Sequence, residues 1–426
     1  MDVTAAEKQD RPRGGNWSRR GVLSGMLGAP VLLLAACSGG DGKPAAASGS
    51  GSAPAGGEAS GSPSTSPKAS VAQITVTPAD GTTAAPFTQP VTVTVLNGTL
   101  VSVDVTDGTG KAIAGQLSAD KASWTSTATL SSGTKYTVAV SAVDGEQRPA
   151  DANAIFSTAS PANTFVGYFT PEDGTTVGVG MPVSINFNKA ITDRKAVQRA
   201  ITVVADPPVE VVGHWFDSTR LDFRPEEYWA KGTKVTLKLR LKDVAGAKGV
   251  YGTQSKDVTF TVGRSQVSTA DLTADTLTVR TDGRVTATYP VIGGAPEHRT
   301  WAGKLVISEK YQQTRMNSST VGLGSEYDIP DVPHAQRLTT SGTFIHGNYW
   351  SPASQFGNDN TSHGCIALQD VQGGNDPGTD AAKFYASSMV GDVVEVVNSG
   401  DRAVSPANGL NGWNMSWSEW VAGSAV

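Results

Sequence analysis

The stretch TLTVRTDGRVTATYPV, residues 276–291, alternates apolar and polar side chains on either side of Asp282-Gly283. Alternation with period two predicts half-buried β-strands, and an Asp-Gly pair between two such runs predicts a tight hairpin turn. We therefore predict a β-rich domain with little helix over residues 264–398. Four further segments predict two strands, a short helix and a return strand, in that order: GKLVISEKY (303–311), SGTFIHG (341–347), TDAAKFYASSM (379–389) and DVVEVV (392–397).

A repeated sequence upstream of this domain indicates two similar units. Short alternating runs and frequent turn residues in both units are typical of β-sandwiches of about 100 residues. We predict two tandem immunoglobulin-like sandwiches, residues 71–160 and 161–263, which lack the cysteine pair of antibody domains. The repeated motifs are TPADGTT (77–83) with TPEDGTT (170–176), and GTKYTVAV (133–140) with GTKVTLKL (232–239).

The composition limits the class of protein. The 426 residues include 34 Lys and Arg and 39 Asp and Glu, which gives a formal net charge of −5. No segment after the first twenty residues concentrates Lys and Arg, so we expect no nucleic-acid partner. Gly, Ser, Thr, Ala and Val dominate, and this favours short strands and turns over charged surface helices.

Residues 1–36 predict a secretory signal peptide. Arginines precede an apolar run from Val22 to Ala36, which is too short and too interrupted for a membrane span. The run ends in LLAAC, which resembles a bacterial lipobox, and by that resemblance Cys37 becomes the lipidated first residue of the mature protein. SRRGVL (18–23) also resembles a twin-arginine export signal.

Residues 37–70 predict a lipidated, flexible tether. After Cys37 the segment contains no aromatic residue and no aliphatic residue larger than Ala, so it cannot bury enough apolar surface to order itself. We expect an extracytoplasmic protein, anchored to the outer face of the cell membrane and reaching into the cell wall. Cys365 is then the one remaining thiol. A lone thiol in an oxidising compartment is exposed to oxidation, so its presence is better explained by a functional role than by packing.

Cys365 ends a polar, glycine-rich loop, HGNYWSPASQFGNDNTSHGC (346–365), that begins with His346 at the end of a predicted strand. A thiol, a base and glycine-exposed backbone N–H groups are the parts that an acyl-transfer site needs. A second hypothesis is that Cys365 is buried and chemically inert. A zinc site is a third, and its ligands would be His346, Asp359, His363 and Cys365.

The loop resembles the signature of the L,D-transpeptidases, whose catalytic domain is called YkuD-like: HGNYW is followed by TSHGC. RMNSSTVG (315–322), SGTFIHG (341–347) and GDVVEVVN (391–398) also resemble segments of that domain. The tail GWNMSWSEW (412–420), within a Trp-rich extension over residues 399–426, resembles the C-terminal piece of actinobacterial members with two immunoglobulin domains. We expect its tryptophans, Trp413, Trp417 and Trp420, to brace the catalytic domain.

The resemblance implies a role for each residue of the signature. Cys365 is the nucleophile, His346 is its base, and the carbonyl of Gly347 orients the imidazole. The N–H groups of Gly364 and Cys365 stabilise the oxyanion, and His363 supports the cysteine loop. The residues expected on the substrate side, of which Ser362 also supports the loop, are Met316, Tyr327, Ser341, Gly342, Trp350 and Ser362.

One position departs from the family pattern: Ala367 stands where many members have Asn, and the polar contact of that Asn is lost. The resemblance implies a peptidoglycan L,D-transpeptidase that forms 3→3 cross-links through a cysteine thioester and releases D-alanine. Its partners are a donor tetrapeptide stem and an acceptor amine, carbapenems are inhibitors, and no metal or cofactor is required. An L,D-carboxypeptidase with the same site and a non-catalytic wall-binding lipoprotein are the alternatives.

Overall fold

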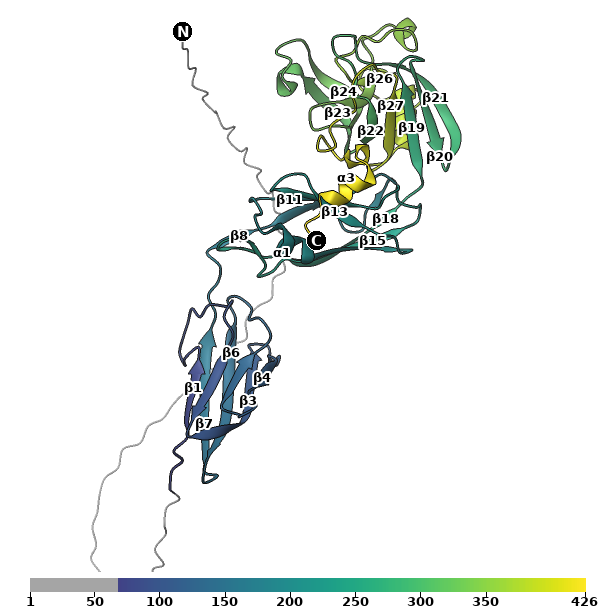
Figure 1. The fold of residues 1–426 in the computed structure, drawn as a ribbon. Coiled ribbons are helices and arrows are strands. Elements are labelled where there is room, and N and C mark those ends of the chain that lie inside the picture. The colour runs from purple at the N-terminus through teal and green to yellow at the C-terminus, as the bar shows by residue number, and fades with distance from the viewer. Residues whose placement is uncertain (1–67) are drawn as a thin grey trace, which may run out of the picture. The chain divides into compact units, whose positions relative to one another are not determined.

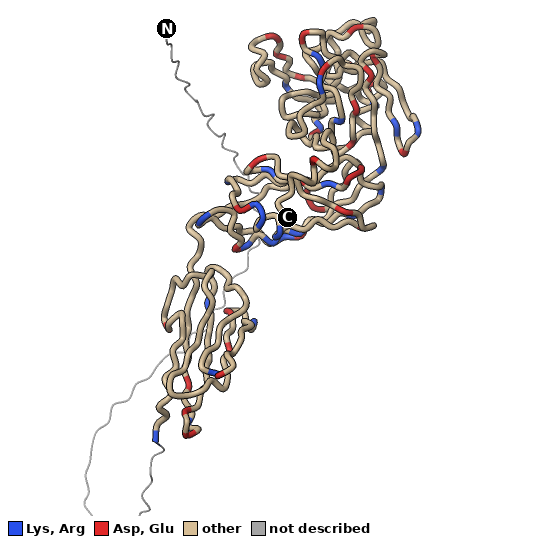
Figure 2. Tube along the Cα trace, in the orientation of Figure 1, with Lys and Arg blue, Asp and Glu red and all other residues tan. Residues whose placement is uncertain are grey.

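The computed structural model describes residues 68–426 (Figure 1). The predicted signal peptide, Cys37 and the tether up to residue 67 lie outside the described residues. Strands dominate and form two immunoglobulin-like sandwiches followed by a domain built on a nine-stranded sheet, so the predicted fold class is confirmed. Within residues 68–426 no helix has the length and apolar character needed to cross a membrane. Basic and acidic residues are interspersed along these domains (Figure 2).

The first sandwich packs a four-stranded sheet, in the order β1-β2-β5-β4, against a three-stranded sheet, β3-β6-β7. Side chains alternate between the core and solvent along β6, and Trp124, Tyr136 and Phe156 are buried between the sheets. The strands are β1 (Gln73–Thr77), β2 (Thr92–Leu96), β3 (Gly98–Asp107), β4 (Gly115–Leu117), β5 (Ser123–Ser126), β6 (Lys135–Asp144) and β7 (Pro149–Ser157).

The second sandwich has two four-stranded sheets, β10-β18-β15-β12 and β13-β14-β11-β9, and a small sheet, β16-β17-β8. Trp215 and Trp229 are buried in its core. Its elements are β8 (Asn163–Phe165), β9 (Gly167–Thr170), β10 (Thr176–Val177), β11 (Val183–Phe187), α1 (Arg194–Arg199), β12 (Ile201–Asp206), β13 (Val212–Trp215), β14 (Arg220–Arg224), β15 (Lys234–Arg240), β16 (Ala245–Ala247), β17 (Val250–Gly252) and β18 (Ser255–Val262).

The repeated motifs adopt the same backbone conformation in both sandwiches. Gly81 and Gly174, at matching places in the first motif, have φ of 76° and 74°. Gly133 and Gly232, which open the second motif, also have positive φ, 59° and 82°. Glycine tolerates this left-handed conformation because it lacks Cβ. The sequence repeat therefore marks turns of the same kind in two sandwiches.

The third domain is built on one sheet in the order β22-β27-β19-β20-β21-β26-β25-β24-β23. Asp282 and Gly283 both have positive φ, 49° and 78°, as the predicted hairpin turn requires. Its elements are β19 (Gln266–Asp271), β20 (Thr276–Thr281), β21 (Arg284–Ile292), β22 (Gly303–Val306), β23 (Glu309–Asn317), η1 (Ser318–Val321), β24 (Asp328–Arg337), β25 (Phe344–Asn348), η2 (Ala353–Gln355), β26 (Ile366–Gln369), α2 (Asp380–Ser387) and β27 (Val393–Val397). The C-terminal extension adds η3 (Gly412–Asn414) and α3 (Trp417–Ala422).

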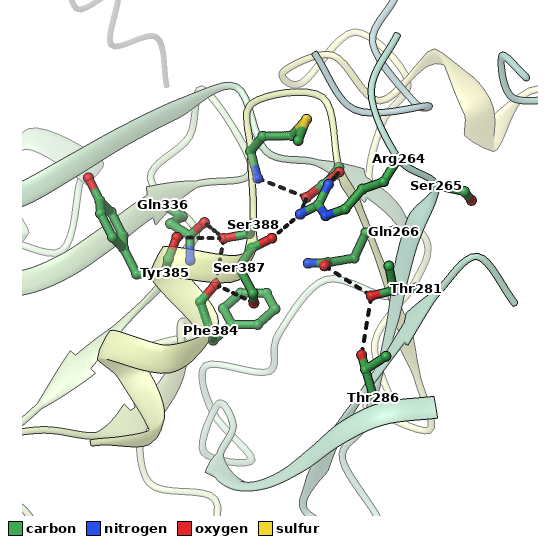
Figure 3. Close-up of polar contacts among 12 residues, drawn as sticks. Arg264, Ser265, Gln266, Thr281, Thr286, Gln336, Phe384, Tyr385, Ser387 and Ser388 are labelled. Carbon is green, nitrogen blue, oxygen red and sulfur yellow. Dashed lines mark hydrogen bonds and ion pairs between the residues drawn. The ribbon is translucent and has the colours of Figure 1, made fainter. Parts of the chain in front are cut away.

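Arg264, where the chain leaves the second sandwich, fastens the C-terminal end of α2. Its guanidinium pairs with both carboxylate oxygens of Asp392, at 3.1 and 2.9 Å, and donates to the carbonyl of Ser387 (Figure 3). Burial raises the pKa of Asp392 to about 6, and Arg264 opposes that rise. Ser388 Oγ donates to the side chain of Gln336 in β24. Helix α2 is thus held against β24, and it also contacts β25, which carries His346, and β26, which follows Cys365.

The C-terminal extension bonds to two domains at once. Asn411 accepts from Val306 N–H at 2.8 Å and donates to the carbonyl of Leu338, both in the third domain. Trp413, by contrast, donates to the carbonyl of Gly180 in the second sandwich and belongs to that sandwich's core. Trp420 is fully buried and donates to the carbonyl of Val212 in β13. The expectation that the tryptophans brace the catalytic domain is therefore corrected, because two of them pack on the second sandwich.

Candidate active site

A cavity of about 260 Å³ opens where β25 and β26 run side by side. These two strands are parallel, and in their register His346 lies opposite Ala367, two residues after Cys365. His346 was expected at the end of a strand but lies inside β25. Seven of the residues predicted for the site line this one cavity: Met316, Tyr327, His346, Trp350, Ser362, His363 and Cys365.

The hydrogen bonds of His346 define its tautomer. Its Nδ1 lies 2.8 Å from the carbonyl oxygen of Gly347, which can only accept, so Nδ1 carries the proton. Nε2 is then unprotonated and free to accept a proton. The ring stacks on Trp350, with centroids 5.8 Å apart and planes inclined by 20°. A backbone carbonyl thus holds the ring at Nδ1, and Nε2 is able to act as a base.

Burial keeps both members of the pair neutral. It raises the pKa of the Cys365 thiol to about 11, a rise that the nearby N–H of Phe344 opposes. Burial also lowers the pKa of His346 below its ordinary value, while the Gly347 carbonyl and the Asp370 carboxylate act in the other direction. At neutral pH the cavity is therefore lined by a neutral thiol, whose hydrogen bond goes to the Gly342 carbonyl, and by an unprotonated imidazole.

The cysteine loop is closed by Ser362 and turned by Gly364. Ser362 Oγ donates to the carbonyl of Cys365 at 2.6 Å and accepts from the N–H of Gly364 at 3.2 Å. Gly364 has φ of 103°, a conformation that favours glycine. The N–H of Gly364 is therefore bonded within the loop, and the N–H of Cys365 follows it at the same turn.

Ser341 and Gly342 do not line the cavity, although they were predicted on the substrate side. The carbonyl of Gly342 lies 3.7 Å from Cys365 Sγ and accepts from the thiol. Ser341 instead bonds to Asn408 of the C-terminal extension through both its N–H and its hydroxyl. The backbone at Gly342 therefore contacts the Cys365 sulfur, and the bonds of Ser341 to Asn408 hold that backbone in place.

Ala367 gives the cavity an apolar floor. It is 1% exposed, pairs with Ile292 of β21 across the sheet, and packs with Ile292 and Phe356 in a small apolar cluster. A methyl group here offers no hydrogen bond to a substrate amide. The polar side chains on the other walls include those of Tyr327 and Ser362.

Asp370 supports the base from behind and was missed from the sequence. Its carboxylate is buried, bonds to His334 Nδ1 at 2.7 Å and accepts from Thr379 Oγ1 at 3.0 Å. A Cβ added at Gly347 would overlap this carboxylate. Gly347 is thus required for space, and its carbonyl, which holds His346, depends on that close approach.

Gly347→Ala is therefore expected to displace the carbonyl that orients His346. Misplacement of a catalytic group by about 1 Å can cost on the order of 10²-fold in rate, so we expect acylation of Cys365 to slow by roughly ten- to a hundredfold. Acylation rate and melting temperature should be measured together. Gly145→Ala, at a glycine with open space around it, is the control that should change neither. An unchanged rate in Gly347→Ala would contradict this role of the carbonyl.

His363 contacts Glu326 and not the catalytic pair. Its Nε2 lies 3.1 Å from Glu326 Oε2, and its ring lies 5.0 Å from that of Tyr327. The zinc alternative with His346, Asp359, His363 and Cys365 is not assembled. In residues 68–426 the group of three metal-ligating side chains that converges is His298, Glu326 and His363. His298 and Glu326 come from separate connections, so no spacing in the sequence points to them.

Comparisons with known proteins agree with this geometry. Residues 82–245 match a bacterial Ig domain family, and residues 265–396 match the L,D-transpeptidase catalytic domain. L,D-transpeptidase 2 of Mycobacterium tuberculosis is 34% identical over 360 residues, 83% of this chain and 85% of the relative. L,D-transpeptidase 5 of the same species is 33% identical, over 83% of this chain and 77% of the relative.

A solved L,D-transpeptidase in complex with imipenem is 30% identical, covers 56% of this chain and all of the other, and has a TM-score of 0.46. The relatives that match over most of both chains carry the assignment, because they extend across the sandwiches as well as the catalytic domain. The chain therefore belongs to the L,D-transpeptidase family.

Proposed function

We propose that the protein forms 3→3 cross-links in peptidoglycan through a thioester on Cys365. The observation that carries the proposal is the convergence of Cys365 and His346 on one cavity, with Nδ1 of His346 held by the Gly347 carbonyl and Nε2 left free. A neutral thiol beside a neutral imidazole is the starting state for general-base activation of a nucleophile. Membership of the L,D-transpeptidase family supports the same reaction class.

In the first step, Cys365 Sγ attacks the carbonyl carbon of the third residue of a tetrapeptide stem, and His346 Nε2 takes the thiol proton. The oxyanion is stabilised by the N–H of Cys365, and by that of Gly364 once it leaves Ser362 Oγ. The C–N bond to the terminal D-alanine then breaks, and the imidazolium returns its proton to the departing amine. The product is a thioester between the stem and Cys365.

In the second step, the amine of a neighbouring stem attacks the thioester carbonyl. His346 accepts a proton from that amine, the C–S bond breaks, and the thiolate is reprotonated. The new amide joins the third residues of two stems. Water in place of the amine would give an L,D-carboxypeptidase, so the outcome depends on how well the cavity admits an amine and excludes water.

The location of the protein rests on its first residues. We propose that residues 1–36 direct export, that Cys37 carries lipid, and that residues 37–70 tether the enzyme to the outer face of the membrane within the wall. The support is the lipobox-like LLAAC followed by a segment without large apolar residues. A carbapenem is proposed to acylate Cys365, because its strained carbonyl offers the same thiol an acyl group.

Intact mass spectrometry tests the proposal. Purified, reduced protein is incubated with a carbapenem in one sample and with a disaccharide-tetrapeptide in another. We expect one equivalent of carbapenem, located by peptide mapping on the peptide that contains Cys365, and in the second sample a cross-linked dimer with released D-alanine. Released D-alanine without dimer would establish the carboxypeptidase. Folded protein without any adduct would favour the non-catalytic, wall-binding alternative.

A further inference from the structure

Three potential metal ligands gather at the edge of the cavity, outside the reaction described above. His298 comes from the β21–β22 connection, Glu326 from the β23–β24 connection and His363 from the cysteine loop. Glu326 Oε2 lies 3.1 Å from His363 Nε2 and 3.5 Å from His298 Nε2, and the three ligand atoms lie within 4.8 Å of one another. We propose that these side chains bind a divalent transition metal of the zinc type.

Both separations from Glu326 to the histidines fit tetrahedral coordination. Zinc bonds to nitrogen and oxygen of about 2.0–2.2 Å place neighbouring ligand atoms roughly 3.3 Å apart. The separations of Glu326 Oε2 from His363 Nε2, 3.1 Å, and from His298 Nε2, 3.5 Å, lie on either side of that value. A hydrogen bond explains the 3.1 Å contact between Glu326 and His363. The 3.5 Å contact between Glu326 and His298 is longer than an ordinary hydrogen bond, so hydrogen bonding alone does not explain why all three side chains converge. Two imidazoles and one carboxylate suit zinc and leave a fourth position for water or a substrate group.

The two histidines are positioned by the backbone. The N–H of Ala295 donates to the carbonyl of Ser362 at 2.8 Å, and the N–H of His298 donates to the carbonyl of Ala295 at 2.9 Å. The turn that carries His298 is thereby joined to the loop that carries His363. Their rings lie 5.0 Å apart, centroid to centroid. The two nitrogen ligands of a metal ion would therefore come from two segments that are hydrogen-bonded to each other.

The third ligand belongs to a different wall of the cavity. Glu326 precedes Tyr327, and the same β23–β24 hairpin carries Met316; both Tyr327 and Met316 line the cavity. A metal shared by Glu326 and the two histidines would fasten this hairpin to the cysteine loop. Binding would fix one wall of the cavity and stabilise the folded protein by mass action.

Calorimetric titration of Zn²⁺ into metal-free protein carrying Cys365→Ala tests the proposal, because the variant removes the competing thiol. We expect one equivalent to bind and the melting temperature to rise. Added to that background, His298→Ala and Glu326→Gln should each weaken zinc binding by at least roughly tenfold and abolish the rise, since loss even of an outer-shell partner costs 10- to 100-fold. Mg²⁺, which prefers an octahedral oxygen shell, should not bind.

Glu297→Gln, at the exposed residue before His298, is the matched control and should keep the zinc affinity. No binding by folded protein, or binding that survives both His298→Ala and Glu326→Gln, would overturn the proposal. The titration involves no peptidoglycan and no acylation, so its result is independent of the transpeptidase reaction. With the thiol present, metal-free His298→Ala should retain acylation by a carbapenem, because His298 lies outside the cavity lining.

Discussion

Cys365→Ala is expected to form no acyl adduct with a carbapenem, and His346→Ala to form one about 10²–10⁴ times more slowly than the unmodified protein at pH 7.5, the usual contribution of a general base. The reason is the protonation state of the pair. With the thiol pKa raised to about 11, very little thiolate exists at neutral pH without transfer of its proton to His346. The measurement is the second-order acylation rate, followed by intact mass with EDTA present.

The two proteins should also differ in pH dependence. In the unmodified protein the rate requires unprotonated His346, whose pKa lies below its ordinary value, so the rate should be level from neutral pH upward and fall only in acid. In His346→Ala only ionised thiol reacts, so the rate should rise about tenfold per pH unit towards the thiol pKa near 11. His346→Gln, which keeps a polar side chain of similar size, is the control for packing and should behave like His346→Ala.

Equal rates in the two proteins at neutral pH would contradict general-base activation by His346. A rate in the unmodified protein that rises steeply above pH 8 would do so as well, because it would show that preformed thiolate is the reactive species. Asp370 bears on the same measurement, since its buried carboxylate favours the protonated imidazole. The Asp370 carboxylate packs against Gly347 and does not line the cavity, so its effect on the rate should come through the base.

The features that could be predicted from the sequence are those that short sequence patterns determine. Alternation around Asp282-Gly283 predicts the hairpin because two residues with positive φ suffice to fix its turn. The repeated motifs predict two sandwiches because each repeat contains the glycines that its own turns require. The signature from His346 to Cys365 predicts the reactive pair, since both ends of that loop return to adjacent parallel strands.

What the sequence could not predict depends on contacts between distant segments. The nine-strand order places β27 beside β19 and β26 beside β25 by parallel pairing, which no short pattern specifies. Asp370 and His334 meet across 36 residues, and His298, Glu326 and His363 come from three connections. The tryptophans of the tail predict that the tail is buried, but they do not show which domain it packs on. The contact with the second sandwich could therefore not be predicted.

Trp420→Ala is expected to destabilise the protein by about 3–5 kcal/mol, the usual range for removing a buried Trp from a core. Trp420 is fully buried, stacks on His214 with centroids 4.8 Å apart, and donates to the carbonyl of Val212. Its ring also lies 4.4 Å from the guanidinium of Arg224, which is 2% exposed and makes its hydrogen bonds to backbone carbonyls.

The cation adds to the cost of the substitution. Burial lowers the pKa of Arg224 to about 10, a measure of how poorly its charge is solvated, and Trp413 also faces the guanidinium at 4.7 Å. Removing Trp420 takes away an aromatic face that stabilises this charge and leaves a cavity beside it. Trp420→Phe should cost less, because a ring remains over the guanidinium and the losses are the hydrogen bond to Val212 and the smaller volume difference between indole and phenyl.

Scanning calorimetry distinguishes the two possible partners of the tail. Because Trp420 packs on β13, its loss should lower the transition of the second sandwich, by roughly 12–25 °C for such a change in a domain of about 100 residues. A sandwich transition that does not move would contradict the packing described here. The acylation rate of folded Trp420→Ala should be kept, since Asn408 and Asn411 still hold the backbone at Ser341 and Leu338. Deletion of residues 405–426 removes these asparagines too, so it should lower both the melting temperature and the acylation rate.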